Sequence, residues 1–355
     1  MTPKTAAAIL PSRNEAATIA AVSTAVDAAL DDARAVVLHA DSSDGPDTAE
    51  HFTAARSRAR KVGLTGLQRG KGAQILAAAR RAEISEADVV LIADTDTRNP
   101  DPTIYRALVS RVRRGASMAI ADYPRHWDEA NLTNHVARPL ISAATGHDVP
   151  QPLAGDLAIS REALAAAARA AAALPGELAA CVNGYGIDAF LLLTAATVGP
   201  IDSVRLDEPK RHAGSFPHLP VIFHQAVPVL LHMTATGSRP ITPPDSGPVV
   251  YRCADRALPP HRAETMLTTL DSFAASSGRY DDWPWPLPVA NAWRAVNSGT
   301  PAADAAHQLW PHYLHRVRDW LTSGQQATTR QRTRMLAAAH ARLQITLIPP
   351  AGASS

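Results

Sequence analysis

Short apolar runs alternate with longer alanine-rich stretches through the first 125 residues of the chain. The apolar runs predict strands at residues 6–10, 35–40, 62–67, 88–93 and 116–121. The intervening stretches predict helices at residues 16–30, from 46, at 72–82 and from 100 or 102. Strands that alternate with helices form βαβ units, whose strands lie parallel in one sheet. The sequence therefore predicts an α/β fold with a mostly parallel sheet flanked by helices.

Polar residues follow three of these predicted strands at the point where each strand ends. They lie at residues 11–15, 41–44 and 94–96. In an open parallel sheet, ligands bind at the carboxyl ends of the strands. We therefore expect the three clusters to converge on one ligand site at one edge of the sheet.

The chain changes character after residue 238, where prolines become frequent. Two helices are predicted there, at residues 302–321 and 328–343, followed by a loose Pro-Pro-Ala-Gly tail. We predict one domain over residues 1–238 and a proline-rich connection with a helical extension over 239–355.

Composition excludes several classes of protein. The 35 lysines and arginines nearly balance 33 aspartates and glutamates, so no cationic field favours a nucleic-acid partner. Two cysteines cannot build a disulfide framework or a thiolate zinc site, which fits a reducing compartment. The opening apolar stretch is too short to predict a signal peptide, and no apolar run reaches membrane-spanning length. We expect a cytoplasmic, globular protein with no membrane span.

The segment Asp94-Thr95-Asp96 directly follows the clearest predicted strand. Residues two apart on an extended segment point to the same side, so both carboxylates can face one cation. Paired carboxylates are hard ligands that suit Mg²⁺ or Mn²⁺ on a diphosphate. The alternative is a pair of loop acids that cap the helix near Pro100. The position after a buried strand favours the metal site.

Gly70-Lys71-Gly72 begins the predicted helix at 72–82. Glycines let the backbone approach a ligand, a helix N-terminus favours anions, and a lysine adds a positive charge. The segment lacks the Ser or Thr of a Walker loop and the third glycine of a dinucleotide fingerprint. The alternative is a turn with a solvated lysine.

The loops at 11–15 and 41–44 can offer backbone and carboxylate acceptors to a base and a ribose. Two simpler alternatives stay open. Asn14 can cap the helix that follows it, and residues 41–44 can form a solvated turn.

The order PSRNE, DSSDG, GKG and DTD resembles the nucleotide-sugar-binding half of the GT-A glycosyltransferases, which have a Rossmann-like fold. The series continues through Gln151-Pro152-Leu153-Ala154-Gly155-Asp156, Gly184-Tyr185-Gly186-Ile187-Asp188 and Arg211-His212. It is similar to the retaining glucosyl-3-phosphoglycerate synthases and, more distantly, to mannosylglycerate synthase. The resemblance covers residues 5–230.

The resemblance implies a donor-nucleotide site in residues 1–125. Its residues would be Pro11, Arg13, Asn14, Glu15, Asp41, Ser42, Gly70, Lys71, Asp94, Thr95 and Asp96. Lys71 would neutralise the diphosphate. A Mg²⁺ or Mn²⁺ ion would be held by Asp96 with Asp94 nearby, and His212 would complete the set.

The resemblance also implies an acceptor site in residues 126–220. Sugar or acceptor would contact Asn131, Thr133, Gly155, Tyr185 and Asp188, and the catalytic residues would be Asp188, Asp156 and Lys71.

Two departures from the family pattern bear on the acceptor. Asp188 stands where the family carries a longer Glu. Asn131-Leu132-Thr133 precedes Arg138-Pro139 where the family places a phosphate-holding Arg and Thr ahead of a Lys-Pro pair. Without that arginine the bidentate phosphate clamp is lost, so we expect a hydroxyl-rich acceptor rather than 3-phosphoglycerate.

The sequence thus predicts a metal-dependent glycosyltransferase that moves a sugar from a nucleoside diphosphate sugar, of UDP-glucose or GDP-mannose type, to a small hydroxylated acceptor with retention. A homodimer is a candidate assembly. Three alternatives stay open: an inverting transferase with Asp156 as base, a sugar-phosphate nucleotidylyltransferase, and a sugar-nucleotide-binding protein without turnover.

Overall fold

The computed structural model describes residues 5–212, 214–236, 249–275 and 283–347. The chain folds into two compact units, each made of two separate segments. Unit 1 comprises Met1–Tyr123 and Leu153–Ala213, and unit 2 comprises Pro124–Pro152 and Gly214–Ser355. This division differs from the predicted single boundary after residue 238, because residues 124–152 and 214–236 belong with the C-terminal helices. The predicted tail and the boundary itself lie outside the described residues.

Unit 1 contains a seven-stranded sheet, which confirms the predicted α/β architecture. In spatial order the strands are β3 (Arg60–Leu64), β2 (Val36–Asp41), β1 (Ala6–Ser12), β4 (Val89–Ile92), β7 (Leu157–Ser160), β5 (Met118–Asp122) and β8 (Ile201–Arg205). Neighbouring strands are parallel except at β7, which runs antiparallel to both β4 and β5.

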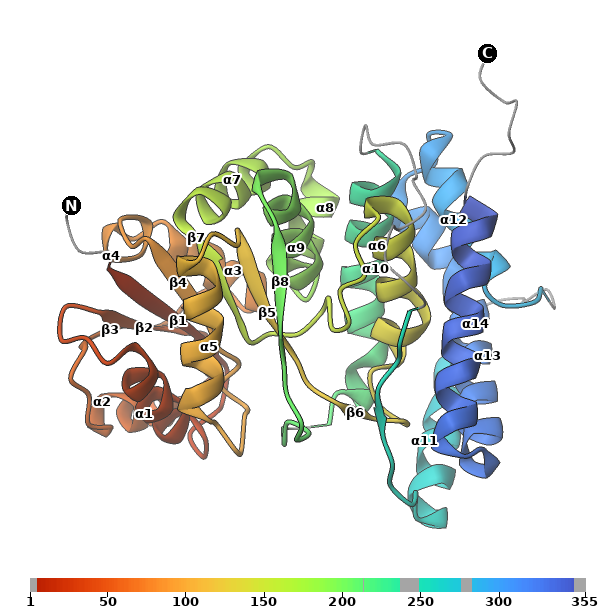
Figure 1. The fold of residues 1–355 in the computed structure, drawn as a ribbon, viewed down its shortest axis with the longest axis horizontal. Coiled ribbons are helices and arrows are strands. Elements are labelled where there is room, and N and C mark those ends of the chain that lie inside the picture. Colours follow the sequence, from red (N-terminus) through yellow and green to blue (C-terminus); the bar gives the residue numbers. More distant parts are fainter. Residues whose placement is uncertain (1–4, 213, 237–248, 276–282, 348–355) are drawn as a thin grey trace. The chain divides into compact units, whose positions relative to one another are not determined.

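Helices cover both faces of this sheet. They are α1 (Ile19–Leu30), α2 (Asp47–Ala54), α3 (Lys71–Ala79), α4 (Ala82–Ser85), α5 (Pro102–Arg113), α7 (Arg161–Ala172), α8 (Gly176–Asn183) and α9 (Ile187–Val198). Helices α1 and α5 pack together on one face, whereas α3, α7 and α9 lie against the other (Figure 1). Four of the five predicted strands match closely. The third was predicted at 62–67 and lies at Arg60–Leu64, because this edge strand is mostly half-exposed and its apolar pattern is weak.

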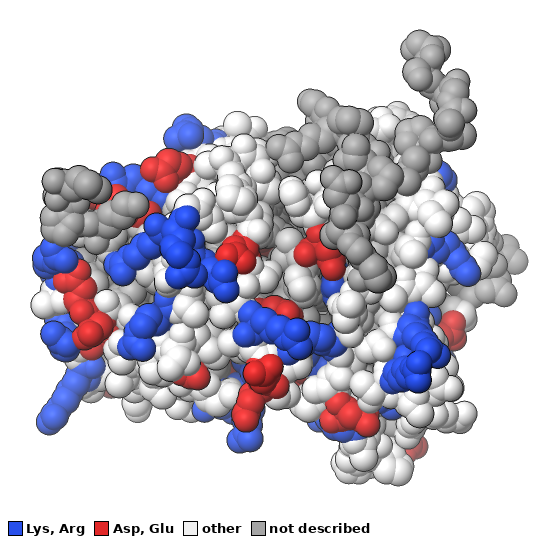
Figure 2. All heavy atoms as spheres, viewed as in Figure 1, with Lys and Arg blue, Asp and Glu red and all other residues white. Residues whose placement is uncertain are grey.

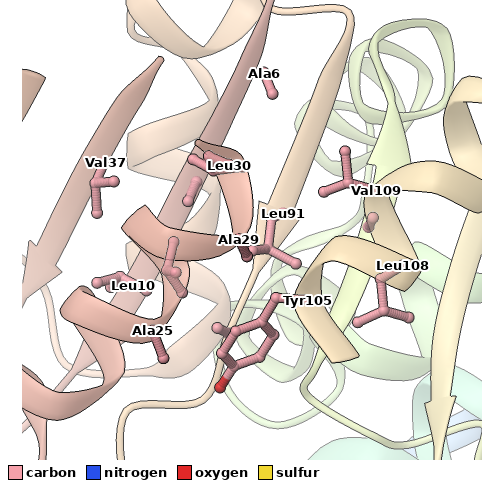
Figure 3. Close-up of a cluster of buried hydrophobic side chains, with 14 of the residues drawn as sticks. Ala6, Leu10, Ala25, Ala29, Leu30, Val37, Leu91, Tyr105, Leu108 and Val109 are labelled. Carbon is pink, nitrogen blue, oxygen red and sulfur yellow. The ribbon is translucent and has the colours of Figure 1, made fainter. Parts of the chain in front are cut away.

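One part of the hydrophobic core lies between the sheet and helices α1 and α5. Because alternate side chains of a strand point to the same face of the sheet, every second strand residue contributes to it. Ala6 and Leu10 of β1 and Leu91 of β4 point to this face and are buried (Figure 3). Tyr105 and Leu108 of α5 pack against them. This packing fixes the strand register, and with it the direction in which the residues after each strand point.

Unit 2 is mainly helical. Its elements are β6 (Arg125–His126), the π-helix η1 (Thr133–Ala137), α6 (Arg138–Thr145), the 3-10 helix η2 (Phe216–His218), α10 (Leu219–Ala235), β9 (Cys253–Ala254), α11 (Pro260–Ala274), α12 (Leu287–Asn297), α13 (Ala302–Gln326) and α14 (Thr329–Leu347). The last two confirm the predicted C-terminal helices. Aromatic rings of Phe223, Trp310 and Tyr313 join α10 to α13, with centroid separations of 4.8 Å from Phe223 to each of the other two.

The described surface carries both signs of charge. Lysine and arginine lie among aspartate and glutamate on the face that Figure 2 shows. Within the residues that the structure describes, no single helix is long and apolar enough to cross a membrane. Only α8 and α9 taken together reach that length, and they are bent by 104° at their junction.

Candidate active site

Two lysines and three aspartates alternate in an ion-pair chain at the carboxyl end of β4. The Nζ atom of Lys71 lies 2.9 Å from Asp188 Oδ1 and 2.9 Å from Asp94 Oδ1. The Nζ atom of Lys210 lies 3.0 Å from Asp94 Oδ2 and 2.8 Å from Asp156 Oδ2. The order Asp188–Lys71–Asp94–Lys210–Asp156 defines the ion-pair chain. It carries one more carboxylate than ammonium group.

Each member of the ion-pair chain comes from the end of a different element. Asp94 follows β4, and Asp156 directly precedes β7. Lys71 is the first residue of α3, and Asp188 lies in the first turn of α9, where a negative charge is favoured by the helix dipole. Lys210 lies beyond β8. The sheet therefore gathers groups from distant parts of the sequence at one edge.

Electrostatics keep both lysines and Asp94 of the ion-pair chain charged, whereas burial raises the pKa of Asp188. Burial would lower the pKa of both lysines, but Asp188 and Asp94 outweigh it at Lys71 and raise the pKa. Asp156 and Asp94 do the same at Lys210. Burial would raise the pKa of Asp94, but the charges of Lys210 and Lys71 outweigh it and lower the pKa. At neutral pH both lysines are cations and Asp94 is an anion.

Asp96 and His212 form a separate pair beside the ion-pair chain. His212 Nδ1 lies 3.8 Å from Asp96 Oδ2, and their side chains are 15% and 29% exposed, respectively. Burial and the negative charge of Asp94 raise the pKa of Asp96. The part of this shift that comes from the Asp94 charge would also favour a cation beside Asp96.

Two hydrogen bonds, one between backbone groups and one to the Asn99 side chain, bring His212 close to Asp96. Arg98 N donates to Arg211 O at 2.8 Å, and Arg211 N donates to Asn99 Oδ1 at 2.7 Å. The segment after Asp96 is thus joined to the segment before His212.

The structure does not bring Asp94 into the predicted metal set. Its carboxylate oxygens contact Lys71 and Lys210. Among the described residues, no group of three or more His, Cys, Asp or Glu side chains is arranged to hold a metal ion. Of the three predicted metal ligands, Asp96 and His212 lie close to each other.

The predicted nucleoside loops after β1 and β2 lie side by side. Ser12 and Asp41 are partners in the register of the two strands. Ser42 N donates to Ser12 O at 3.1 Å, and Gln74 of α3 donates to Ser42 Oγ at 2.8 Å. Asp41 and Ser42 are almost fully buried. Thr95 Oγ1 also donates to Pro11 O at 2.7 Å, which links the DTD segment to the first loop.

Asn14 and Asp44 exchange hydrogen bonds across these loops. Asn14 Nδ2 donates to Asp44 Oδ2 at 3.0 Å, and Asp44 N donates to Asn14 Oδ1 at 3.0 Å. Asn14 has φ 60°, a left-handed conformation that Asn tolerates better than most residues. Arg13 lies 3.3 Å from Asp44 and is half-exposed.

Thr18 donates to Glu15 Oε2 at 3.1 Å, and burial raises the pKa of Glu15. The alternative that Asn14 caps the following helix does not hold, because no side chain caps α1.

Two glycines let α3 begin against the end of α8. A Cβ atom on Gly70 would lie 2.3 Å from Asn183 O, and one on Gly72 would lie 1.8 Å from Val182 O. Gly70 also has φ 128°, which side chains rarely adopt. Both glycines are required for this close approach, which places Lys71 between Asp94 and Asp188.

Gly155 lies directly against the Asp94 carboxylate. A Cβ atom there would lie 2.0 Å from Asp94 Oδ1 and 2.3 Å from its Cγ. Asp94 cannot move away without breaking its contacts with the lysines. Gly155 thus leaves room for the ion-pair chain.

Gly155→Ala is expected to displace Asp94 and to lower the free energy of unfolding by about 1–3 kcal/mol, as overpacking does. Activity should fall more steeply than stability because Asp94 lies in the site. The matched control is Gly176→Ala, where an added Cβ meets nothing within 4 Å. Urea unfolding measures the stability and a turnover assay measures the activity. Equal losses of stability and activity in Gly155→Ala and Gly176→Ala would contradict the role of Gly155 in making room for Asp94.

The other predicted acceptor residues divide between the units. Tyr185 is 40% exposed and belongs to unit 1 with Gly155 and Asp188. Asn131 and Thr133 belong to unit 2, where both are buried at the start of η1.

Sequence reasoning missed the role of Lys210. This lysine is buried in the ion-pair chain, between Asp94 and Asp156. Tyr123, whose hydroxyl donates to Asp156 Oδ2 at 2.7 Å, was also missed. Lys210 is two residues before His212, a spacing that could have placed both side chains on one side of an extended segment.

Comparison with known proteins supports this architecture. No protein-family model matches the chain. Curated glucosyl-3-phosphoglycerate synthases from Mycobacterium tuberculosis (strain H37Rv) and Mycobacterium bovis are each 29% identical over 212 residues, which is 54% of this chain and 60% of theirs. The chain thus spans about three fifths of the length of these curated relatives.

Solved structures of the M. tuberculosis enzyme match more of the chain. The complex with Mn²⁺, UDP-glucose and glycerol 3-phosphate is 26% identical, with a TM-score of 0.52 over 66% of this chain and 82% of that one. The complex with Mn²⁺, UDP and phosphoglyceric acid is 27% identical, with a TM-score of 0.52 over 65% and 78%. A complex with Mg²⁺ and UDP matches at the same TM-score. In sequence and in structure, the chain resembles glucosyl-3-phosphoglycerate synthase and has the GT-A glycosyltransferase fold.

Proposed function

We propose that the chain is a metal-dependent glycosyltransferase that transfers a sugar from a nucleoside diphosphate sugar, of UDP-glucose or GDP-mannose type, to a small hydroxylated acceptor with retention. The observation that carries the proposal is the Asp96–His212 pair beside the ion-pair chain, on a GT-A fold. The relatives bind Mn²⁺ or Mg²⁺ together with UDP or UDP-glucose.

The residues present fit a divalent cation that is shared with the diphosphate. Adjacent ligands about 2.1 Å from an octahedral ion lie about 3 Å apart, so the 3.8 Å between Asp96 and His212 would shorten by about 1 Å when both bind one cation. Mg²⁺ is commonly bound by one or two protein ligands, with phosphate oxygens and water in the other positions. When bound, the cation would supply Lewis-acid stabilisation of the leaving diphosphate.

The charge balance of the site explains why a cation is needed. Lys71 alone does not provide free positive charge, because Asp94 and Asp188 already neutralise it. The ion-pair chain has three carboxylates against two ammonium groups, and Asp96 adds a further carboxylate. A diphosphate brought to this site meets net negative charge, so a divalent ion is required to offset the repulsion.

The role of Lys71 follows from its position. Its ammonium group lies at the N-terminus of α3, where the helix dipole also favours anions. The Lys71 ammonium group can replace its contact with one of the two carboxylates by a contact with a diphosphate oxygen while staying in the same position. Asp188, which shares Lys71 with Asp94, would then orient the transferred sugar through its hydroxyl groups.

Retention is supported by the environment of Asp156. An inverting enzyme needs a carboxylate base that reaches the acceptor. The Asp156 side chain is fully buried and accepts hydrogen bonds from Tyr123 Oη, from Asp94 N and from Lys210 Nζ. A carboxylate so buried and so fully bonded cannot reach an acceptor hydroxyl, which disfavours the inverting alternative.

The acceptor is proposed to be less anionic than 3-phosphoglycerate. Arg138, the arginine next to the predicted acceptor loop, is 3% exposed. It binds both Asp148 oxygens at 2.7 Å and donates to Val250 O at 3.0 Å. Its guanidinium is therefore committed to structure within unit 2.

The direct test is transfer from a panel of UDP and GDP sugars to glycerate, glycerol, simple sugars and 3-phosphoglycerate, with Mn²⁺ or with EDTA. We expect Mn²⁺-dependent release of UDP or GDP with at least one hydroxylated acceptor. The anomer of the product, read by NMR, should match that of the donor. Transfer of equal rate in EDTA, or an inverted anomer, would contradict the proposal.

A further inference from the structure

A histidine, a serine and an aspartate lie in contact where β1 and β2 end. Ser12 pairs with Asp41 in the register of the two strands, and His39 lies two residues before Asp41 on β2. Residues two apart on a strand face the same side, so Ser12 can reach both side chains. Its Oγ atom lies 2.5 Å from His39 Nε2 and 3.0 Å from Asp41 Oδ1. We call His39, Ser12 and Asp41 the His39 relay.

The relay is almost completely removed from solvent. His39 is 0% exposed, and Ser12 and Asp41 are each 3% exposed. The His39 ring also packs against Phe52, with centroids 4.7 Å apart. Burial lowers the pKa of His39 to about 4, against the opposing effect of the Asp41 charge. His39 is therefore a neutral imidazole at physiological pH.

Only one arrangement of protons satisfies both contacts of the serine. A carboxylate oxygen accepts, so Ser12 donates its single proton to Asp41. The Ser12 oxygen then accepts from the Nε2–H of His39. The opposite tautomer would bury an N–H at His39 Nδ1, which has no hydrogen-bond partner in the structure, and an unpaired buried donor is costly. The donors therefore run from His39 to Ser12 to Asp41.

This arrangement is unlike a nucleophilic serine site. A nucleophilic serine gives its proton to the histidine and presents its oxygen to a substrate. Here the serine proton points at Asp41, and the hydroxyl is buried. The relay is built to hold Asp41.

The relay leaves one oxygen of Asp41 to act on a ligand. Asp41 Oδ1 accepts from Ser12 and also from Ser43 N at 3.0 Å and Ser43 Oγ at 2.5 Å. In the part of the chain that the structure describes, Asp41 Oδ2 makes no hydrogen bond. Because Oδ1 is fully used, Oδ2 is the acceptor that remains for an N–H or O–H group of a ligand.

We propose that His39 and Ser12 are positioning residues for nucleoside recognition, which fix Asp41 so that its Oδ2 accepts from the bound nucleoside. The inference rests on the proposed function, because it takes Asp41 to face a nucleoside diphosphate. It adds two residues that contact no substrate and act only through Asp41. Gln74 supports them from α3, since it donates to Ser12 O at 2.5 Å.

The test measures UDP and GDP affinity with Mn²⁺ by calorimetry, using the full chain. Ser12→Ala and His39→Leu should each weaken binding of the better nucleotide about tenfold, because each removes a hydrogen bond on which the position of Asp41 depends. The double variant should bind as the single variants do, because both changes break the same relay. His39→Gln keeps an N–H donor and should bind within about threefold of the unaltered protein. In turnover assays the donor KM should rise with kcat little changed.

Ser23→Ala is the matched control for Ser12→Ala. Ser23 is also a fully buried serine of unit 1, but its hydroxyl has no hydrogen-bond partner among the described residues. The Ser23→Ala variant should bind nucleotide with the affinity of the unaltered protein. If Ser12→Ala does not fold, the nucleotide affinities of His39→Leu and His39→Gln are compared instead, and weaker binding by His39→Leu alone supports the inference.

Three results would overturn the inference. Unchanged nucleotide affinity in folded Ser12→Ala or His39→Leu would remove it while leaving the proposed function intact. An equal loss in Ser23→Ala would assign the effect to packing. Failure of the unaltered protein to bind either nucleotide would overturn the proposed function and this inference together.

Discussion

Asp96→Asn is expected to lower kcat/KM by at least about a thousandfold, which corresponds to about 4 kcal/mol of lost transition-state stabilisation. Asparagine keeps the size of the side chain but removes the charge that would bind the divalent ion beside His212. Without the ion, the diphosphate meets only the ion-pair chain, in which carboxylates outnumber the lysines. Several kcal/mol is the usual contribution of a Lewis-acid cation to charge stabilisation.

The control for this variant is Asp202→Asn. Asp202 is a surface aspartate of unit 1 whose ion pair with Arg111, at 3.1 Å, is well exposed. Its loss should change activity by less than about twofold, as exposed ion pairs contribute little. Initial rates over a range of Mn²⁺ concentrations distinguish the two variants. Turnover of Asp96→Asn near that of the unaltered protein would show that the metal lies elsewhere.

Lys210→Met is expected to be the most destabilising single change in the site, by about 3–5 kcal/mol. Methionine fills much of the same volume but leaves Asp156 without its ammonium partner and Asp94 with only Lys71. An unpaired carboxylate in a buried position has lost its water without compensation. Urea unfolding at pH 7.5 measures the difference.

The pH dependence separates this charge effect from simple loss of packing. In the unaltered protein the lowered pKa of Asp94 adds stability above the unfolded-state pKa, and this stability is lost as the pH falls through the folded-state pKa. In Lys210→Met, protonation of a carboxylate relieves the unpaired charge. The destabilisation should therefore shrink as the pH is lowered from 7.5 toward 5.

Lys61→Met is the matched control for Lys210→Met. Lys61 donates to backbone carbonyls at the end of α2, including Thr53 O at 2.8 Å, rather than to a carboxylate. Its loss should destabilise by about 1 kcal/mol with no comparable dependence on pH. A Lys210→Met variant that unfolds like Lys61→Met at both pH values would contradict the importance of the ion-pair chain.

The sequence predicted the part of the fold that is set by local pattern. Apolar runs at 6–10, 35–40 and 88–93 became three adjacent parallel strands because they are buried on both faces. It did not predict that β7 runs antiparallel between β4 and β5. Strand direction depends on the path of the preceding chain, and the four residues of β7 carry no sign of it.

The division into units was equally hidden. Segments 124–152 and 214–236 are joined to the C-terminal helices by packing between α6 and α14 and between α10 and α13. A boundary drawn along the sequence cannot represent a unit that the chain leaves and re-enters.

In the candidate site, the sequence named four residues of the ion-pair chain but not their electrostatic partners. Lys71, Asp94 and Asp188 were each named from a separate motif. In the structure Lys71 contacts Asp188, which is 117 residues away in the sequence. Lys210 reaches Asp94 from 116 residues away. Pairings at such separation arise from the tertiary fold, so they could not be read from motif spacing. The consequence is chemical: Asp94, expected as a metal ligand, is held by two lysines.

The central claim is a divalent cation that Asp96 and His212 hold only together with a nucleoside diphosphate. Electron paramagnetic resonance of Mn²⁺ measures this directly, by counting free ion with and without UDP or GDP. Two protein ligands should bind Mn²⁺ weakly alone, and the nucleotide should tighten binding at least about tenfold, with the effect abolished in Asp96→Asn. Mn²⁺ affinity that is the same with and without either nucleotide would contradict the account.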